Sequence, residues 1–259
     1  MKKPLILLTN DDGITAPGLR SLIQFMKEIA DVVVVAPDSP QSGMGHAITI
    51  DNTLYSKKVI IDKEKGAPLE YSCSGTPADC VKLGLQEILN KRPDMVVSGI
   101  NHGSNSSINV IYSGTMSAAI EAGIEGIPAI GFSLCDYAWN ADFSAVGDFA
   151  KKIVLEALKN GIPSGTVLNV NIPKTDGLPP KGIKVCRQAK ANWKERFDKR
   201  TSPTGKEYYW LTGEFELLDK GEDTDEHALS QGYISMVPTQ FDLTAHHTIQ
   251  HINNWHLNE

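Results

Sequence analysis

The sequence predicts an α/β protein in which helices cover both faces of a mostly parallel β-sheet. Short apolar runs alternate with helical patterns through the first two thirds of the chain, as in proteins whose strands are joined by crossover helices. The runs at residues 5–9 and 32–36 are almost wholly apolar, which is typical of strands buried on both faces. After Pro173 the pattern changes to polar and aromatic segments, which predict a separate hairpin.

The predicted elements follow one another closely along the chain. Strands are predicted at residues 5–9, 32–36, 69–73, 95–98, 127–133, 166–171, 182–187 and 234–238. Helices are predicted at residues 17–29, 77–89, 115–122 and 143–158, and the tail after Leu243 is also predicted to be helical. Residues 48–61 alternate in character and include turn residues, which indicates a hairpin excursion from the sheet.

A hairpin arm is predicted at about residues 192–216. A Ser-Pro-Thr-Gly turn at 202–205 separates its two halves, and the aromatic triplet Tyr-Tyr-Trp follows at 208–210. Two strands alone are marginally stable and would leave this aromatic surface exposed. We therefore expect residues 1–259 to form one α/β domain whose arm is buried against another subunit.

Composition and charge limit the classes of partner. The 259 residues carry a net charge of -6, which argues against binding to long nucleic acids, because Lys and Arg supply most of that affinity. The apolar stretch after the basic start covers only residues 5–8, too short for a signal peptide or a membrane span. Cys73, Cys80, Cys135 and Cys186 are scattered without zinc-site spacing, which predicts buried, reduced thiols in a cytoplasmic protein.

Two adjacent carboxylates, Asp11 and Asp12, follow the first predicted strand directly. Ligands of open α/β sheets bind outside the carboxyl ends of the strands. The two charges repel each other there, and a hard divalent cation removes that conflict. Gly13 allows a sharp turn that brings the carboxylates together, and Pro17 favours a helix whose N-terminal amides attract an anion. The alternative is that both aspartates are turn and capping residues.

Two more polar segments end strands at the same edge. Residues 38–46, which include Ser42 and His46, offer hydroxyls and backbone amides after the second strand. His46 alone is more typical of a structural or surface histidine than of a catalytic one. A Ser-Gly-Thr sequence at 74–76 offers further amide donors, although an ordinary helix cap explains it equally well.

A long loop follows the strand at 95–98. Asn101 supplies a neutral oxygen ligand, and a second Ser-Gly-Thr at 113–115 supplies hydroxyls and a helix N-terminus for phosphate. A loop of this length in a tight α/β chain favours a function over a mere connection.

Four polar loops therefore converge on one predicted sheet edge, which is a stronger signal than any single loop. The ligands they offer are oxygens, which suit Mg²⁺ or Mn²⁺ better than zinc. His246, His247 and His251 offer an alternative metal pair on the tail, but a solvated helix face explains them better.

Several longer motifs contain these loop residues, namely LLTNDDGITAPG at 7–18, APDSPQSGMGHAIT at 36–49, SGTPADCV at 74–81, and SGINHGSN and YSGTMSAA within 98–119. Together they closely resemble the survival protein SurE family. The resemblance continues through GKEYYWLTGE at 205–214 and GYISMVP at 232–238, so it covers nearly the whole chain, whereas the segment 246–259 matches no motif of the family.

The resemblance implies a Rossmann-like α/β fold and a cytoplasmic nucleotidase that uses one divalent metal ion, Mg²⁺ or Mn²⁺, per subunit. It implies hydrolysis of nucleoside 5′- and 3′-monophosphates, and in some members of short polyphosphate. The extended hairpin is exchanged between subunits in the family, which implies a homodimer or homotetramer. The implied metal ligands are Asp11, Asp12, Ser42 and Asn101, and the implied phosphate-binding residues are Asn10, Ser113, Gly114 and Thr115.

These residues predict metal-assisted hydrolysis of a phosphate ester. Asp11 or Asp12 would accept a proton from the attacking water, and the sequence leaves open which. His46 is a weaker candidate for protonating the leaving oxygen.

Two other functions are compatible with this pattern. An aspartyl-phosphate phosphatase of the haloacid dehalogenase type would use an aspartate as nucleophile, but that family separates its two aspartates by one residue. A metal-gated nucleotide sensor would bind the same ligand without hydrolysing it. Trapping a phosphorylated aspartate would identify the first, and an absence of phosphate release would identify the second.

Overall fold

The computed structural model describes residues 3–62, 66–174, 177–255 and 257. Within these residues, nine strands form one sheet in the order β3-β4-β2-β1-β5-β6-β7-β11-β8. The strands are β1 (Leu5–Thr9), β2 (Asp31–Pro37), β3 (Ser56–Val59), β4 (Leu69–Cys73), β5 (Met95–His102), β6 (Ala129–Leu134), β7 (Thr166–Ile172), β8 (Ile183–Val185) and β11 (Ile234–Gln240).

The central strands are parallel, which confirms the predicted type of sheet. β4, β2, β1, β5, β6 and β7 pair in parallel, whereas β3 runs antiparallel to β4 and β11 runs antiparallel to β7. β1 lies between β2 and β5, so the chain first builds outward on one side of β1 and later on the other. In open α/β sheets, such a reversal leaves a ligand-binding crevice beyond the carboxyl ends of the strands.

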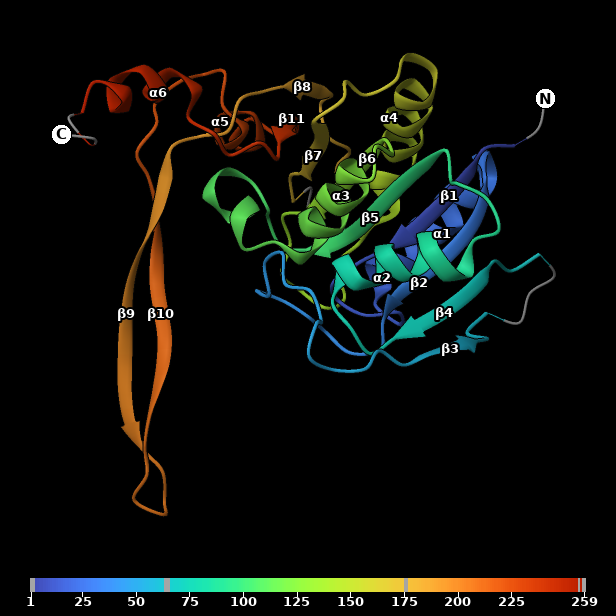
Figure 1. Cartoon of the computed structure of the whole chain (residues 1–259), viewed down its shortest axis with the longest axis horizontal. Coiled ribbons are helices and arrows are strands. Elements are labelled where there is room, and N and C mark those ends of the chain that lie inside the picture. The colour runs from blue at the N-terminus through green and yellow to red at the C-terminus, as the bar shows by residue number, and fades with distance from the viewer. Residues whose placement is uncertain (1–2, 63–65, 175–176, 256, 258–259) are drawn as a thin grey trace.

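Four helices cover the two faces of the sheet (Figure 1). The core on one face contains side chains of α1 (Pro17–Ile29) and α4 (Gly147–Asn160), and that on the other contains side chains of α2 (Pro77–Leu83) and α3 (Gly114–Ile124). Along β1, Ile6 and Leu8 enter the first core while Leu5 and Leu7 enter the second. This alternation explains why β1 is apolar at every position but its last.

Helix ends agree closely with the sequence signals. α2 begins with a reciprocal cap, in which the Asp79 N–H donates to Thr76 Oγ1 at 3.2 Å and the Thr76 N–H donates to Asp79 Oδ2 at 2.9 Å. The helix predicted at 77–89 continues past α2 as a π-helical turn at Gly84–Ile88. The one predicted at 143–158 starts with a 3₁₀ turn at Ser144–Val146.

Residues 48–61 do not form the predicted hairpin. Only β3 lies in this segment, and it pairs with β4 outside it. The part before β3 is held by side chains of the α2 cap, because the Thr49 N–H and hydroxyl donate to Asp79 at 3.0 and 2.6 Å. These bonds fix Thr49 on the helix cap, where it cannot join a ladder of strands.

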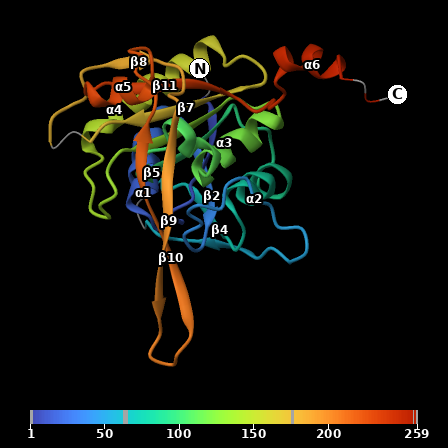
Figure 2. The same ribbon diagram turned by 90° about the vertical axis from the view of Figure 1, so that its left-hand side faces the viewer.

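The arm is a separate two-stranded sheet of β9 (Ala191–Thr201) and β10 (Glu207–Leu217), which confirms the hairpin predicted at about 192–216. Figures 1 and 2 show it projecting far from the main sheet. Its turn is closed by the Ser202 N–H, which donates to the Lys206 carbonyl at 2.8 Å, and by the Gly205 N–H, which donates to the Ser202 carbonyl at 2.9 Å.

The chain after β10 contains α5 (Asp225–Ser230), β11 and α6 (His246–Asn253), so the described part of the tail is helical as predicted. Residues 256, 258 and 259 of the tail lie outside the described residues. His246, His247 and His251 are exposed on α6. No helix in the described ranges is long and apolar enough to cross a membrane.

All four cysteines are free thiols. Cys73, Cys80 and Cys186 are buried as predicted, whereas Cys135 is only partly buried.

Candidate functional site

The carboxylate pair lies at the end of β1, at the point where the sheet topology reverses. Asp11 is 4% exposed, and its Oδ1 accepts a hydrogen bond from the Thr115 hydroxyl at 2.6 Å. Burial is the main cause that raises the pKa of Asp11 to about 6, and the charge of Asp12 is the next. Burial also raises the pKa of Asp12, although its Oδ2 accepts the His102 N–H at 3.2 Å. The site thus concentrates negative charge in a place where charge is poorly solvated.

The turn after the pair brings the second polar loop beside it. Gly13 adopts a φ of +100°, which favours glycine, and its carbonyl accepts the Asn10 side-chain amide at 2.9 Å. The Gln41 N–H donates to the Asp11 carbonyl at 2.7 Å. This main-chain bond places the next residue, Ser42, next to the aspartates.

Asn101 reaches the site from β5, which is four residues longer than the strand predicted at 95–98. The pairing of β5 with β6 shifts register between Ser98 and Asn101 and then resumes. The Asn101 Nδ2 donates to the Gly103 carbonyl at 2.8 Å, so the amide oxygen is left for a ligand. The carbonyl of Ile100 packs against Gly18 of α1, where an added Cβ would lie 1.9 Å from its oxygen.

The Ser-Gly-Thr triplet at 113–115 forms the N-terminus of α3. Ser113 is the N-cap, and its hydroxyl oxygen accepts the Met116 N–H at 3.0 Å. Gly114 lies so close to Asp11 that a Cβ there would be 2.7 Å from the Asp11 Cβ. The helix therefore begins directly against the carboxylate, and its first N–H groups have no partners within the helix.

These segments enclose a cavity of about 180 Å³. Four of the predicted site residues line it, namely Asp11, Ser42, Asn101 and Ser113. Gly114 and Thr115 contact the site through Asp11 rather than through the cavity wall. No Lys or Arg is among the lining residues of this cavity in the part of the chain that is described.

Three further predicted residues do not line the cavity: Asp12 adjoins it, because its Oδ2 accepts the N–H of the lining residue His102 at 3.2 Å, whereas Asn10 and His46 lie elsewhere. Asn10 is fully buried behind the turn, and its Oδ1 has no hydrogen-bond partner among the described residues. His46 contacts α3, with its Nε2 2.9 Å from Glu121 Oε2, and the other Glu121 oxygen accepts Lys82 Nζ at 2.6 Å. Neither Asn10 nor His46 lines the cavity, so their roles in phosphate binding and proton donation stay predictions.

The first Ser-Gly-Thr sequence, at 74–76, also serves outside the cavity. Thr76 caps α2, and the Ser74 hydroxyl accepts the Tyr55 N–H at 2.9 Å. The ordinary capping role therefore accounts for these contacts.

Several contacts at the site are invisible to sequence patterns. The loop that holds Asn105 to Ser107 is anchored on residues far along the chain: the Asn105 N–H donates to Asn171 Oδ1 at 2.8 Å, and the Ser107 N–H donates to Asp225 Oδ2 at 2.8 Å. Asp225 is fully buried on α5. In the sequence Asp225 is only one of several acids in a polar stretch, which is not a specific signal.

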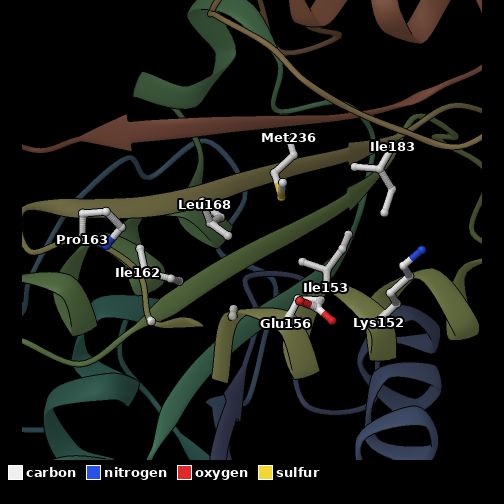
Figure 3. Close-up of a pocket in the computed structure, with 10 residues that line it drawn as sticks. Lys152, Ile153, Glu156, Ile162, Pro163, Leu168, Ile183 and Met236 are labelled. Atoms are coloured by element: carbon white, nitrogen blue, oxygen red, sulfur yellow. The ribbon is translucent and has the colours of Figure 1, made fainter. Parts of the chain in front are cut away.

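A larger, apolar cavity of about 260 Å³ lies away from the carboxyl ends of β1 and β5, between α4 and the β7, β11 and β8 edge of the sheet (Figure 3). Ile153, Leu168 and Met236 line it, with Lys152 and Glu156 at its border. It holds none of the predicted site residues, so its size does not make it the catalytic centre.

The residues at the strand ends fit a hard divalent cation. Asp11, Asp12, Ser42 and Asn101 offer carboxylate, hydroxyl and amide oxygens, the donors that Mg²⁺ and Mn²⁺ prefer. A cation would also stabilise the ionised form of Asp11, whose pKa is raised first by burial and then by the charge of Asp12. Among the described residues, no group of three or more His, Cys, Asp or Glu is placed to hold a metal.

Fold and site together define an α/β protein with an acidic, oxygen-lined centre at the topological switch point of its sheet. A family model described as "Survival protein SurE" matches residues 6–195, and the chain belongs to this family.

Relatives of known name extend this match over the whole chain. It is 69% identical to a protein of Christiangramia forsetii named "5'-nucleotidase SurE", covering 100% of this chain and 99% of the relative. A protein of the same name from Flavobacterium psychrophilum is also 69% identical, with 100% of both chains covered. The solved SurE protein from Aquifex aeolicus superposes with a TM-score of 0.82 at 42% identity, covering 96% of this chain and 98% of that one.

Proposed function

We propose that this chain is a nucleotidase that uses a divalent metal ion to hydrolyse nucleoside 5′-monophosphates to nucleoside and phosphate. One observation carries the proposal: four side chains predicted from three separate loops line one small cavity at the carboxyl ends of the sheet strands. The names of the relatives, over chains of the same length, support the nucleoside part of the substrate. We extend the proposal to 3′-monophosphates, because a site that binds the phosphate places few demands on the rest of the ester. We extend it also to short polyphosphate, whose terminal phosphate is joined through an anhydride, as a slower reaction than that of the monoester.

The proposed roles follow from where the side chains lie. Asp11, Asp12, Ser42 and Asn101 would hold the ion, which when bound polarises a phosphoryl oxygen and lowers the pKa of water. The N-terminus of α3 and the Ser113 hydroxyl would donate hydrogen bonds to the phosphate oxygens. Asp11 or Asp12 would accept the proton of the attacking water, and His46 remains a candidate for protonating the leaving oxygen.

The charge of the site favours monoesters over triphosphates. A β,γ-phosphate pair needs Lys, Arg or a Walker-type loop to hold it, and the described lining of this cavity contains no Lys or Arg. A single terminal phosphate needs only one cation and the helix amides. We therefore expect AMP to be hydrolysed faster than ADP or ATP.

Phosphate release tests the proposal directly. Purified protein is assayed with AMP, ADP, ATP and a phosphodiester, with chelator and after Mn²⁺ or Mg²⁺ is restored. The expected result is release from the monophosphate that stops in chelator and returns with either metal. Faster turnover of ATP or of the diester, or full activity in chelator, overturns the proposal. Binding of AMP without any release would instead support the sensor.

We also propose that the arm joins subunits into a homodimer or homotetramer around one α/β domain. Its apolar side chains are exposed, with Phe197 69%, Trp210 59% and Leu211 58% accessible. A two-stranded ribbon with such a surface gains stability only when another surface covers it. Replacing residues 200–210 with a short Gly-Ser linker should lower the mass in solution, measured by light scattering. A wild type that is already monomeric at micromolar concentration contradicts this part of the proposal.

A further inference from the structure

Two tyrosines share the small cavity with the proposed metal and phosphate residues. Tyr112 and Tyr137 both line it, and they are 53% and 73% exposed. Large aromatic side chains are costly to leave in water, and the same cavity already holds the groups proposed to bind the phosphate. Because the two rings lie beside the proposed phosphate site, we expect them to contact another part of the same substrate.

Main-chain hydrogen bonds hold the backbone of Tyr112 at a defined place beside the cavity. Tyr112 ends a short 3₁₀ helix (Ser107–Ile111), and its N–H donates to the Asn109 carbonyl at 3.0 Å. Its carbonyl accepts the Gly45 N–H at 3.2 Å, which ties it to the loop that carries Ser42. The residue is thus fixed on both sides although its side chain is exposed.

Tyr137 is held by contact with a glycine. Gly103 has a φ of +103°, and a Cβ there would lie 2.3 Å from the Cε1 atom of Tyr137. The bare backbone of Gly103 therefore makes room for the ring. The next residue, Ala138, is fixed as well, because its N–H donates to Asp136 Oδ1 at 3.0 Å and its carbonyl lies 2.9 Å from His102 Nδ1.

The chemistry of the rings indicates a flat, neutral partner. Neither tyrosine hydroxyl makes a hydrogen bond to another described residue, so the exposed feature is the π-face rather than a buried polar contact. The described cavity lining has no Lys or Arg, so a second anionic group is not favoured. The part of a nucleotide that is flat, aromatic and uncharged is its base.

We propose that Tyr112 and Tyr137 bind the base of the nucleotide by stacking, and that they set the preference for nucleotides over sugar phosphates. This inference rests on the proposed function and deepens it. Every base has a π-face, so stacking tolerates different bases, and the chain should accept more than one. Binding of the base then adds to the affinity that the phosphate supplies, without any base-specific hydrogen bond.

A comparison of two substrates tests the proposal. AMP and ribose 5-phosphate carry the same reacting group, and only AMP has a base. The ratio of their kcat/KM values is measured for wild type, Tyr112→Ala, Tyr137→Ala and the two Phe variants. We expect each Ala variant to lower the ratio about five- to 150-fold, which is the factor for about 1–3 kcal/mol per stacked base at about 1.36 kcal/mol per tenfold. The Phe variants should keep the wild-type ratio, because they keep the ring.

Tyr55→Ala is the matched control, since Tyr55 is 72% exposed and lies outside the cavity lining. It should leave the ratio unchanged. Ala variants with the wild-type ratio overturn the proposal, as do Phe variants that lose as much as the Ala variants.

Binding of adenosine, measured by titration calorimetry, separates failure of this proposal from failure of the proposed function. If neither ester is hydrolysed with Mn²⁺ or Mg²⁺, the nucleotidase proposal fails. The calorimetry then still tests whether the two tyrosines bind the base. Adenosine binding that both Ala variants lose supports stacking. No binding to the wild type overturns it.

Discussion

The electrostatic cost of the metal-free site can be measured with Asp11→Asn. Asp11 is 4% exposed, and burial followed by the charge of Asp12 raises its pKa from 3.8 to about 6. Between pH 4 and 6 the folded protein therefore binds more protons at this site than the unfolded chain does. The free energy of unfolding then falls as the pH rises through this window. The loss reaches about 3 kcal/mol above pH 6, at 1.36 kcal/mol for each unit between the two pKa values.

Asparagine removes the charge and keeps the shape. Its oxygen still accepts the Thr115 hydroxyl, while its NH₂ group replaces a carboxylate oxygen and forfeits any bond that oxygen accepted. In excess chelator at pH 8, Asp11→Asn should thus be more stable than wild type by about 1–3 kcal/mol, the upper value being the full electrostatic cost. The difference should shrink toward pH 4, where the wild-type carboxyl binds its proton.

The assay is urea unfolding at pH 4.5, 6 and 8 with chelator, and at pH 8 with Mn²⁺. Asp51→Asn, at an exposed position, controls for general loss of a charge. Metal should reverse the order, because at 1,000 times its Kd it stabilises wild type by about 4.1 kcal/mol, which exceeds the advantage of the variant, and it binds the variant weakly. The reasoning is refuted if metal-free Asp11→Asn is no more stable than wild type at pH 8.

Two further substitutions test the supports of the site. Gly18→Ala should destabilise the fold by about 1–3 kcal/mol and lower phosphate release, because the added Cβ would lie 1.9 Å from the carbonyl oxygen of Ile100, the residue before Asn101. A variant with the urea midpoint and the activity of wild type would contradict this. Asp225→Asn should cost about 1–3 kcal/mol in urea unfolding, because its carboxylate accepts the N–H groups of Ser107 and Ala189 at 2.8 and 2.9 Å and the amide can accept only one. Glu222→Gln, at an exposed position in the same region, should leave the free energy of unfolding unchanged. An equal loss in this control would contradict the role of the Asp225 hydrogen bonds.

The sheet and its edge were predictable because local rules determine them. A strand buried on both faces must be apolar throughout, and residues 5–9 meet that condition through their alternating contacts with two cores. Polar residues directly after such strands must lie at one edge, which is why Asp11 and Ser42 line the same cavity. No long-range information was needed for either inference.

The misplaced features depend on contacts between distant residues. Thr49 alternates like a strand residue, but its hydrogen bonds to Asp79 hold it on a helix cap. His46 lies in a loop that reaches the site, yet its ring contacts Glu121 of α3. Tyr112 and Tyr137 come from two separate loops, and only the folded chain places them in one cavity. A pattern of residue types along the chain cannot report such pairings.

The residues of the Ser-Gly-Thr triplet at 113–115 contact two different parts of the proposed site, the metal ligands and the phosphate-binding groups. The Thr115 hydroxyl donates its proton to Asp11, so this side chain supports the proposed metal ligand rather than the proposed phosphate site. The Ser113 oxygen accepts the Met116 N–H, which leaves the hydroxyl proton for an incoming oxygen. Gly114 has no side chain that could separate them, and a Cβ there would meet Asp11. A bound phosphate would then contact main-chain N–H groups of α3 and the Ser113 hydroxyl. It would lie close to the Asp11 carboxylate, which the Thr115 hydroxyl holds in place.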